Sequence, residues 1–558
     1  MILFARGKRL SGDSPRLISL EILLATDGLW FFPAKYRYDE EGGIKTCLNA
    51  FRHYIEGFIY GIMHYDTSEL GSMDKMKGKH LFESTLKLNV PVEKLFNWHE
   101  NEGAFERLTP PFDPVNVTRR VGGIDGGTVY IAMKAGPVPL TWVAQHYGYK
   151  KNVQFLEDQT SGPFVGPLPF WNGGWHHKHL FEKIDEYNSL VTDRIEYDFP
   201  MKPFGFLLGG RYTKKKLDQM FAYRRNITEN DLYALSKYSG KSLDIAVTGG
   251  SGLIGKELGP YLTTAGHSVE NLVRKRPKKG ELCWNIRKQQ ISSLNGKDAV
   301  VHLAGENIGS LLRWSKWKRK EILESRVKST ALVAKHLASL ENPPKVLICA
   351  SAMGYYGSYG DDILTENSKN GDDYFSYVVK EWEAAAQPAI DAGIRVVFLR
   401  FGIIMSPKGG ALPRILLPAK FGGNPPIGGG KQWWSWLTID DAIGSIYHAI
   451  ITESLSGAVN VASPNTIQQK DFASTLGKIM WGPKLGFMTN LIPLPAFVVK
   501  SVMGEMGDVL LLSSNRIDSS KLIDSGYKFR FENLENGLRH ILGMRREEDL
   551  QCKTEVLS

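Results

Sequence analysis

Cysteine is scarce in this chain of 558 residues, which contains only four. The four are Cys47, Cys283, Cys349 and Cys552, and no pair has the C-x-x-C spacing. This pattern argues against a zinc site or a disulfide framework and fits a reducing compartment such as the cytoplasm. The sequence also lacks a run of eighteen uninterrupted apolar residues, so we expect no membrane span. Glu21 and Asp27 interrupt the N-terminal apolar run, which leaves no clear signal-peptide core.

A strong excess of charge of one sign is also absent. Lys and Arg number 69 and Asp and Glu number 59, a modest net charge of +10 for this length. Such a balance suits anionic ligands such as phosphates and does not by itself argue for a nucleic-acid partner. Hydrophobic content of 42% and charged content of 23% are ordinary for globular protein. The length predicts two to four domains.

The most informative motif is TGGSGLIG at 248–255, which follows the apolar run 245–247 and precedes a helix-compatible segment. Gly249, Gly252 and Gly255 allow a sharp turn from strand to helix. They also let backbone N–H groups approach a pyrophosphate at the positive end of that helix. A glycine triplet is weak evidence in a chain with 57 glycines, so its context decides the interpretation.

The next predicted strand ends about twenty residues after the glycines, where a dinucleotide-binding domain contacts the adenosine ribose. An acidic residue there would accept the ribose hydroxyls of NAD, but the sequence has Arg274-Lys275-Arg276. A guanidinium suits the 2′-phosphate of NADP, so NADP is favoured over NAD. A solvated basic turn is the alternative, and the nearby Lys278 and Lys279 fit it.

Seven further stretches, together with TGGSGLIG, carry a family resemblance. They are HLAGENI (302–308), RWSKWKRKEILESRVKST (313–330), SAMGYYG (351–357), WEAAA (382–386), LRFGII (399–404), QWWSWLTIDD (432–441) and GEMGDVLLLSSNRI (504–517). From about 243 to 542 the chain resembles the extended short-chain dehydrogenases/reductases. More narrowly, it is similar to their atypical epimerase-like family, which has its own short C-terminal domain. The resemblance implies an α/β Rossmann fold with a doubly wound parallel sheet and NAD(P)-dependent oxidoreductase or epimerase activity.

The resemblance also implies where the cofactor binds. The implied cofactor-binding residues are Gly249, Ser251, Gly252, Leu253, Ile254, Gly255, Arg274, Leu303, Ala304, Gly305, Glu321, Arg326 and Ile403. Glu321 is equally well explained as an ordinary salt-bridge partner on its helix. The implied cofactor is NADP.

The catalytic residues follow from the same resemblance, with one departure. Ser351 stands just after the strand 346–350, at the superfamily's position for the substrate-orienting hydroxyl, although a strand-end cap is an alternative. Members of the superfamily also use a Tyr whose pKa is lowered by a Lys nearby. Here Tyr377 precedes Lys380 by three residues rather than four, which rotates it by about 100° on the helix.

We therefore predict Ser351, Tyr377 and Lys380 as the catalytic residues, while the spacing leaves the standard proton relay in doubt. Tyr355 and Tyr356 are alternative acids near the same position. Farther along, Trp434 and Trp436 either stack on a sugar or nucleobase or belong to the core.

Residues 79–235 show a different pattern. An alternating strand near 80–90 is followed by a short helical segment, glycine-punctuated strands and a helix-like segment at 204–226. This order, with the stretches FLEDQ and WHHKHLF, resembles an α+β START-like helix-grip fold of the polyketide-cyclase type. A sheet wrapped around a helix creates an apolar cavity, so a hydrophobic ligand is expected. The polar segment 226–242 is interpreted as a linker.

Three histidines occur together in this half. His177 and His179 share one strand face with Trp175, and His176 lies on the other. A metal site needs a third ligand and carboxylate support, for which the sequence shows no pattern. We therefore interpret the histidines as strand-surface or cavity-lining residues and predict no metal.

Five segments are expected. They are an N-terminal extension (1–78), the START-like domain (79–235), the Rossmann domain (236–489), a family-specific C-terminal domain (490–545) and a tail (546–558). The favoured function is an NADP-dependent oxidoreductase or epimerase acting on a small-molecule substrate in the cytoplasm. The alternatives are an NADP(H)-binding sensor without turnover and a carrier that delivers a lipophilic ligand to a reductase. The oligomeric state stays open.

Overall fold

The computed structural model describes residues 25–26, 29–30, 80–113, 115–135, 138–165, 173–200, 204–238, 240–486 and 493–544. The predicted extension (1–78) and tail (546–558) lie outside these residues, except for the short strands β1 (Ala25–Thr26) and β2 (Leu29–Trp30). The chain divides into two compact units. The first comprises 1–81, 163–175 and 196–215, and the second comprises 82–162, 176–195 and 216–558.

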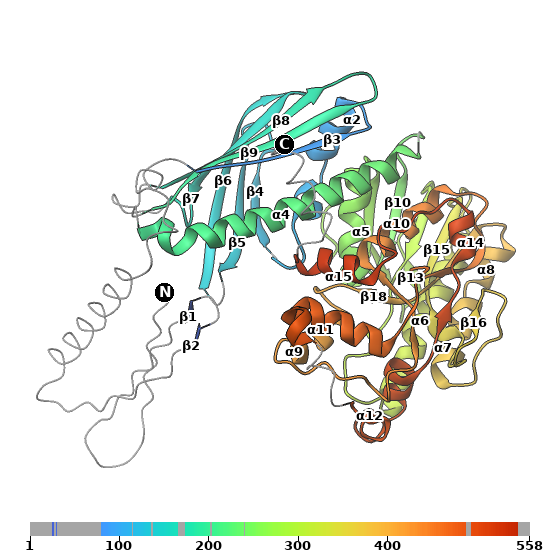
Figure 1. Cartoon of the computed structure of the whole chain (residues 1–558). Coiled ribbons are helices and arrows are strands. Elements are labelled where there is room, and N and C mark those ends of the chain that lie inside the picture. The colour runs from blue at the N-terminus through green and yellow to red at the C-terminus, as the bar shows by residue number, and fades with distance from the viewer. Residues whose placement is uncertain are drawn as a thin grey trace, which may run out of the picture. The chain divides into compact units, whose positions relative to one another are not determined.

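The N-terminal half contains a seven-stranded sheet in the order β3-β9-β8-β7-β6-β5-β4 (Figure 1). Its elements in chain order are β3 (His80–Leu88), α2 (Val92–Glu100), α3 (Ala104–Leu108), β4 (Asn116–Val121), β5 (Thr128–Ala135), β6 (Val138–Lys150), β7 (Gln154–Ser161), β8 (Gly174–Lys183), β9 (Ser189–Asp198) and α4 (Phe204–Ser236). Strands β4 to β8 pair antiparallel. The predicted order of a strand, short helices, an antiparallel sheet and a long helix is present, and β4 is an additional strand.

Alternating burial explains why these strands form a sheet with one covered face. Along β8, His177, His179 and Phe181 are buried while the intervening residues are more exposed. On α4, the side chain of Phe221 lies 5.0 Å from the ring of Phe82 on β3. Successive strand residues point to opposite faces, so one alternate set of each strand packs under the helix.

The predicted linker at 226–242 is wrong over most of its length. Helix α4 continues to Ser236. Within the predicted linker, Ile227 and Asp231 are both fully buried. Asp231 accepts two hydrogen bonds from Arg107 of α3, at 2.8 and 2.9 Å. The sequence suggested a solvated segment because many of its residues are polar. In the structure, Asp231 instead binds a partner elsewhere in the chain.

The C-terminal half is built on an eight-stranded sheet in the order β13-β12-β11-β10-β14-β15-β17-β21. Its strands are β10 (Asp244–Thr248), β11 (Ser268–Val273), β12 (Glu281–Asn285), β13 (Gln290–Ile291), β14 (Ala299–His302), β15 (Val346–Ala352), β17 (Arg395–Phe401) and β21 (Gly457–Val461). All neighbours from β12 to β21 are parallel, and β13 is an antiparallel edge strand. The chain moves outward from β10 to β12 and then returns to β14 on the other side of β10. This reversal confirms the predicted Rossmann fold and places its ligand crevice at the carboxyl ends of β10 and β14.

Helices cover both faces of this sheet. They are α5 (Leu253–Thr264), α6 (Lys316–Ala338), α7 (Tyr374–Ala384), α8 (Gln387–Asp391) and α10 (Ile439–Ile451). Ile348 and Ala350 of β15 pack in a cluster that includes residues of α5 and α10. Leu347 and Cys349 pack in the opposite cluster, with residues of α6 and α8. Strands buried on both faces explain the nearly continuous apolar runs in the sequence.

The remaining elements surround the carboxyl edge and form the C-terminal segment. They are the 3-10 turn η3 (Met353–Tyr355), β16 (Ile363–Leu364), β18 (Ile403–Met405), α9 (Leu412–Ala419), β19 (Trp433–Trp434), β20 (Trp436–Thr438), β22 (Ile467–Gln468), α11 (Gln469–Gly486), α12 (Ala496–Met503), α13 (Glu505–Gly507), the π-helical turn η5 (Asp508–Leu512), β23 (Arg516–Ile517), α14 (Ser520–Asp524) and α15 (Leu534–Leu542). Trp434 and Trp436 are buried in one apolar cluster with Phe472 and Leu538. They are therefore core residues rather than a stacking surface for a ligand.

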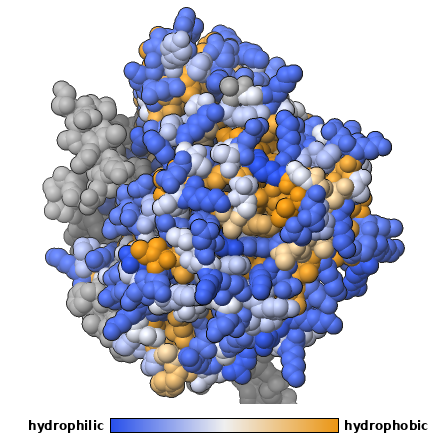
Figure 2. Space-filling view, turned by 90° about the vertical axis from the view of Figure 1, so that its right-hand side faces the viewer, coloured by the Kyte–Doolittle hydropathy of each residue, from blue (hydrophilic) through white to orange (hydrophobic). Residues whose placement is uncertain are grey.

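The surface is mostly hydrophilic on the face shown in Figure 2, with hydrophobic patches between hydrophilic residues. Exposed large apolar residues include Leu312, Phe421 and Phe497. Scattered apolar side chains of this kind are normal on globular proteins. Among the described residues, no helix combines the length and apolarity needed to cross a membrane.

Candidate functional site

The glycine motif forms the turn between β10 and α5. Gly249 has a φ of +74°, which favours glycine. A Cβ on Gly255 would lie 2.4 Å from the carbonyl oxygen of Gly249, too close for any side chain. Gly252 precedes the first residue of α5, and no side chain caps that helix start. The first N–H groups of α5 are thus left for a ligand, and the positive end of the helix favours an anionic one.

A chain of hydrogen bonds fixes the loop beside this turn. The N–H groups of Leu303 and Ala304 lie 3.2 and 3.3 Å from Thr248 Oγ1, which accepts from both. Thr248 Oγ1 lies 2.8 Å from His302 Nδ1, and His302 Nε2 lies 3.1 Å from Ser329 Oγ. The Ser329 hydroxyl donates to the carbonyl oxygen of Arg326.

The directions of these hydrogen bonds define the protonation state of His302. With Thr248 accepting two N–H groups, its hydroxyl proton is directed to His302 Nδ1, and Nε2–H donates to Ser329. His302 is therefore a neutral imidazole. Burial lowers its pKa to about 4, in agreement with this tautomer. The sequence motif HLAGENI contains this histidine but gives no sign of its role.

Arg274 lies just past β11, the strand next to β10. The register pairs Thr248 with Leu272, so Arg274 stands at the same sheet edge as the glycine turn. Arg274, Lys275 and Arg276 are exposed and form no ion pair within the described ranges. The Asn271 side chain fills the space beside Gly250, where a Cβ would lie 2.0 Å from its Oδ1. The geometry thus leaves a free cationic group beside the turn.

The side chain of Arg326, on α6, lies beside Gly305 at the same edge of the sheet. Its guanidinium carbon would lie 3.3 Å from a Cβ on Gly305, and it lies 5.0 Å from the Trp382 ring centroid. The side chain is buried, Nε has no hydrogen-bond partner in the described structure, and burial lowers its pKa to about 10. Glu321, one turn earlier, is partly exposed. A buried cation with an open donor is suited to a ligand at Gly305.

Ser351 is buried and belongs to a charged cluster at the end of β15. Its hydroxyl donates to Glu383 Oε1 of α7 at 2.6 Å. Arg400 of β17 binds the same carboxylate with two hydrogen bonds, Nε to Oε1 at 2.9 Å and Nη2 to Oε2 at 2.8 Å. The register places Ser351 directly opposite Arg400. Glu383 therefore fixes the orientation of the Ser351 hydroxyl, and Arg400 holds Glu383.

Arg400 also reaches the two tyrosines considered as alternative acids. Its Nη1 donates to Tyr356 Oη at 3.0 Å, and Tyr356 in turn donates to Asn460 Oδ1 at 2.7 Å. The Arg400 guanidinium lies 3.5 Å from the centroid of the Tyr355 ring. Burial raises the pKa of Tyr356 to about 12, which makes it a weaker acid.

Tyr377 and Lys380 are both exposed on α7, Tyr377 by 48%. Ser376, which holds the register of the usual Tyr, is buried and donates to the carbonyl oxygen of Asp373. Ile403 lies on β18, where its N–H donates to the carbonyl of Ser435. The structure therefore brings Ser351 together with Glu383 and Arg400, while Tyr377 and Lys380 face solvent.

Glu383 and Arg400 were missed by sequence reasoning, although both stand in quoted motifs. Arg400 lies in LRFGII, where a lone cation occupies the end of an apolar strand. A buried charge at such a position needs a partner, and this requirement is the signal that points to an acidic residue nearby.

Comparisons with known proteins agree with this geometry. A model described as the NAD dependent epimerase/dehydratase family matches residues 245–462, and a domain of unknown function, DUF1731, matches residues 494–541. The human epimerase family protein SDR39U1 is 35% identical over 300 residues, covering 53% of this chain and 99% of the human one. This chain therefore belongs to the NAD dependent epimerase/dehydratase family, in the group that resembles SDR39U1 and carries DUF1731.

Two solved structures extend the comparison. A crystal structure of a nucleoside-diphosphate sugar epimerase from Corynebacterium glutamicum is 31% identical, has a TM-score of 0.68, and covers 85% of this chain and 93% of its own. The human SDR39U1 structure, solved with NADPH, is 34% identical with a TM-score of 0.49 and covers 54% of this chain and 99% of its own. Because 85% exceeds the 53% shared with the human sequence, the Corynebacterium structure also aligns with residues outside the dehydrogenase half.

Proposed function

We propose that the protein is an NADP(H)-dependent oxidoreductase or epimerase of the atypical short-chain type, acting on an unidentified small molecule. The observation that carries this proposal is the uncapped start of α5 at the glycine turn, with the exposed Arg274 on the neighbouring strand. The helix start suits the pyrophosphate, and a guanidinium suits a 2′-phosphate. The human relative, 35% identical over 300 residues, was solved with NADPH, which supports the same cofactor.

The remaining cofactor contacts are the residues implied by the motif. Backbone groups from Gly249 to Gly255 would bind the pyrophosphate, and the loop 303–305 would lie along the adenosine half. Arg326 under Gly305 offers its open Nε to the same region. Glu321 and Ile403 remain predicted contacts.

Ser351 is proposed as the substrate-orienting hydroxyl. Because its proton is committed to Glu383, its oxygen is left to act towards a substrate as a hydrogen-bond acceptor. That arrangement suits a substrate hydroxyl, which donates to Ser351. Tyr377, held near Lys380 with an exposed side chain, remains the predicted acid of the relay. Sugar nucleotides are suitable first substrates, because the Corynebacterium relative is described as a nucleoside-diphosphate sugar epimerase.

The cofactor proposal is tested by titrating the full chain with NADPH and NADH while following nicotinamide fluorescence. Replacing Arg274 by Ala should weaken NADPH about 10- to 100-fold, the value of one charge-assisted hydrogen bond, and leave NADH unchanged. Arg287→Ala is the control, since Arg287 is an exposed arginine on the β12–β13 turn and not on the strand that follows α5. Equal affinity of the wild type for both cofactors, or an equal loss in both variants, would contradict the assignment.

A sensor without turnover is the second candidate, favoured by the exposed Tyr377 and Lys380 and by the one-residue shift between them. Wild-type protein and Ser351→Ala are compared with NADP(H) and a panel of carbonyl and sugar-nucleotide substrates. Turnover that falls in the variant supports the enzyme. Binding of NADPH without turnover of any substrate, unchanged in the variant, supports the sensor.

For the N-terminal half we propose the START-like assignment, supported by its element order and by the long α4 across the sheet. A cavity between them measures about 20 Å³, and its lining includes the polar side chains of His99, Asp193 and Arg224. A cavity of this size holds a water molecule rather than a lipid. A hydrophobic molecule co-purifying with the full chain would support the lipophilic-carrier alternative.

A further inference from the structure

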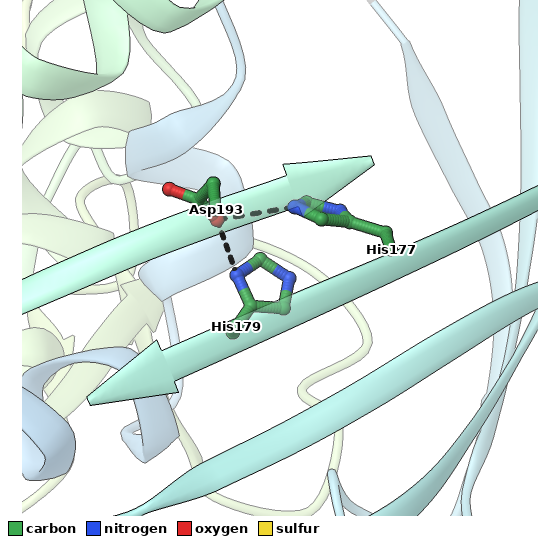
Figure 3. Close-up of side chains that lie close together, drawn as sticks. All are labelled: His177, His179 and Asp193. Atoms are coloured by element: carbon green, nitrogen blue, oxygen red, sulfur yellow. Dashed lines mark hydrogen bonds and ion pairs between the residues drawn. The ribbon is translucent and has the colours of Figure 1, made fainter. Parts of the chain in front are cut away.

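The inner face of the seven-stranded sheet holds a cluster with no part in the dehydrogenase chemistry. His177 and His179 lie two residues apart on β8, and Asp193 faces them from the neighbouring β9 (Figure 3). All three side chains are largely buried, with side-chain exposures of 3%, 9% and 16%. One donor atom from each lies within 4.8 Å of the other two.

The three donor atoms lie close enough together to share one ion. Asp193 Oδ1 lies 3.1 Å from His177 Nε2 and 2.6 Å from His179 Nδ1. Donor atoms that bind one tetrahedral zinc ion at about 2.0–2.1 Å lie roughly 3.3 Å apart. The 2.6 Å ion pair between His179 Nδ1 and Asp193 Oδ1 is shorter than this spacing, so these two side chains must move apart by about 0.7 Å when an ion enters between them.

A second carboxylate sets the tautomer of His177. Glu157 stands opposite His177 on β7, and its Oε1 lies 3.4 Å from His177 Nδ1. A proton on Nδ1 directed to Glu157 leaves the Nε2 lone pair facing Asp193. Histidines that bind metals are commonly held in this way by a carboxylate on the other ring nitrogen.

The charges in the cluster require a further cation. Asp193 and Glu157 bring two negative charges beneath the helix, while Arg224 of α4 supplies one positive charge near both. The balance is completed either by a proton on His177 or by a metal ion. On the open side, the cavity of about 20 Å³ is lined by Ser84, His179, Asp193, Arg224 and Thr228, among others. That volume accommodates one water molecule as a fourth ligand.

We propose that His177, His179 and Asp193 bind a divalent transition-metal ion of the zinc type, with Glu157 orienting His177 and a water completing the coordination towards α4. Two histidines and one carboxylate with an open position is the ligand set of reactive zinc sites and of non-haem iron sites. This revises the prediction of no metal, because the missing third ligand and carboxylate support are both present.

The test uses the full-length protein. Metal content is measured by mass spectrometry after purification, and the chelated protein is then titrated with Co²⁺ while its visible absorption is followed. One ion per chain and Co²⁺ absorption bands of four- or five-coordinate geometry are expected. His179→Ala and Asp193→Asn should abolish the bands, and Glu157→Gln should weaken Co²⁺ binding about 10- to 100-fold.

His176→Ala is the matched control, since His176 lies on the opposite face of β8 and pairs with Asp158. It should bind Co²⁺ as the wild type does. Wild-type protein that takes up neither zinc nor Co²⁺ would overturn the proposal in favour of a protonated His177, without relying on any variant. Equal Co²⁺ binding by His176→Ala and His179→Ala would overturn it too, because the ion would then lie elsewhere.

Discussion

The two sheets of this protein bury polar side chains in different places. In the eight-stranded parallel sheet the strand interiors are apolar, and polar groups such as Thr248, His302 and Ser351 stand at the carboxyl ends. In the seven-stranded sheet, His177 and His179 are buried and Asp193 is partly buried, all in the middle of their strands. A parallel sheet covered on both faces offers ligands only its edge, whereas an antiparallel sheet under a helix offers its inner face. Buried polar side chains therefore lie at the strand ends in the parallel sheet and in the middle of the strands in the antiparallel one.

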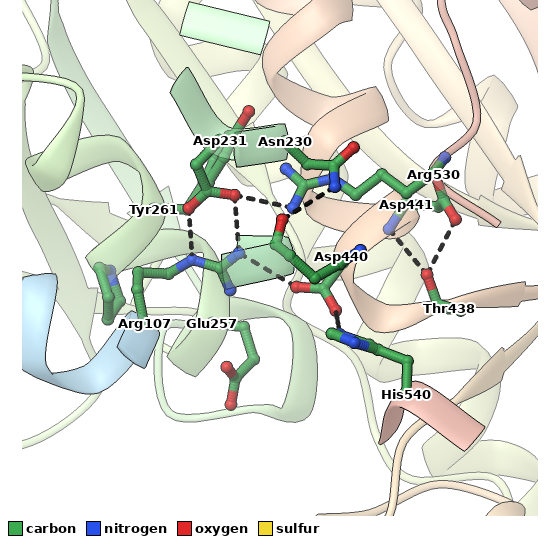
Figure 4. A network of polar contacts seen from close by, with 12 residues as sticks. Arg107, Asn230, Asp231, Glu257, Tyr261, Thr438, Asp440, Asp441, Arg530 and His540 are labelled. Carbon is green, nitrogen blue, oxygen red and sulfur yellow. Dashed lines mark hydrogen bonds and ion pairs between the residues drawn. The ribbon is translucent and has the colours of Figure 1, made fainter. Parts of the chain in front are cut away.

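A third cluster lies outside both sheets and is the most highly charged. Arg107 of α3 binds Asp231 of α4 and, at 3.0 Å, Asp440 of α10 (Figure 4). Arg530 pairs with Asp231 at 2.7 Å, and His540 with Asp440 at 3.5 Å. This network joins residues more than 300 positions apart within the second compact unit. Its groups are paired with one another, which indicates a structural rather than a ligand-binding role.

The largest effect is expected from breaking this network. Arg107→Ala removes two hydrogen bonds from Asp231 and one from Asp440 while both carboxylates stay buried, which should lower the free energy of unfolding by about 3–5 kcal/mol. Arg120→Ala removes an exposed ion pair with Glu106 and should cost at most about 1 kcal/mol. Urea unfolding followed by fluorescence measures both. Equal losses of stability in the two variants would contradict a structural role for this network.

A smaller loss of stability, with a large loss of binding, is expected at the glycine turn. In Gly255→Ala the new Cβ would lie 2.4 Å from the Gly249 carbonyl oxygen, so the turn must shift. The cost should be about 1–3 kcal/mol, with loss of measurable NADPH binding. Gly259→Ala, one turn later on α5, meets no atom within 4 Å and should stabilise the protein by up to about 1 kcal/mol. Tight NADPH binding by Gly255→Ala would show that the turn does not hold the cofactor.

These sites differ in how far the sequence could predict them. TGGSGLIG located the dinucleotide site because its function depends on local backbone geometry, which three glycines encode within eight residues. The partners of Ser351 could not be located in this way, since Glu383 and Arg400 come from a helix and a strand farther along the chain. The same limit explains the error at 226–242. A polar residue looks solvated until the fold supplies its partner, as Arg107 does for Asp231.

The next effect concerns pH and His302. Burial lowers the pKa of His302 to about 4. Between pH 6.5 and 4 this histidine is therefore protonated in the unfolded chain and neutral in the folded one. Stability therefore falls as pH falls through this window, by on the order of 3 kcal/mol for this group. His302→Gln removes that contribution, and the slope of unfolding free energy against pH should become shallower there. His448, also lowered to about 4 chiefly by burial, keeps part of the slope. An unchanged slope in His302→Gln would mean that His302 titrates alike in both states.

The smallest effect on stability is expected at Tyr377. A change in turnover in a Tyr377 variant is therefore the easiest to assign to the chemical step. Its side chain is 48% exposed, and its hydroxyl makes no hydrogen bond to any described residue. Tyr377→Phe should therefore change the free energy of unfolding by less than about 0.5 kcal/mol, and we expect no change in NADPH affinity. Turnover is then compared with Ser351→Ala, whose hydroxyl is buried against Glu383. Since the fold and cofactor binding stay the same, a fall in turnover in Tyr377→Phe belongs to the chemical step and shows that the three-residue spacing to Lys380 works. Turnover equal to the wild type would instead place proton transfer on a group at the Ser351 end of the parallel sheet, where the buried polar residues of this fold converge.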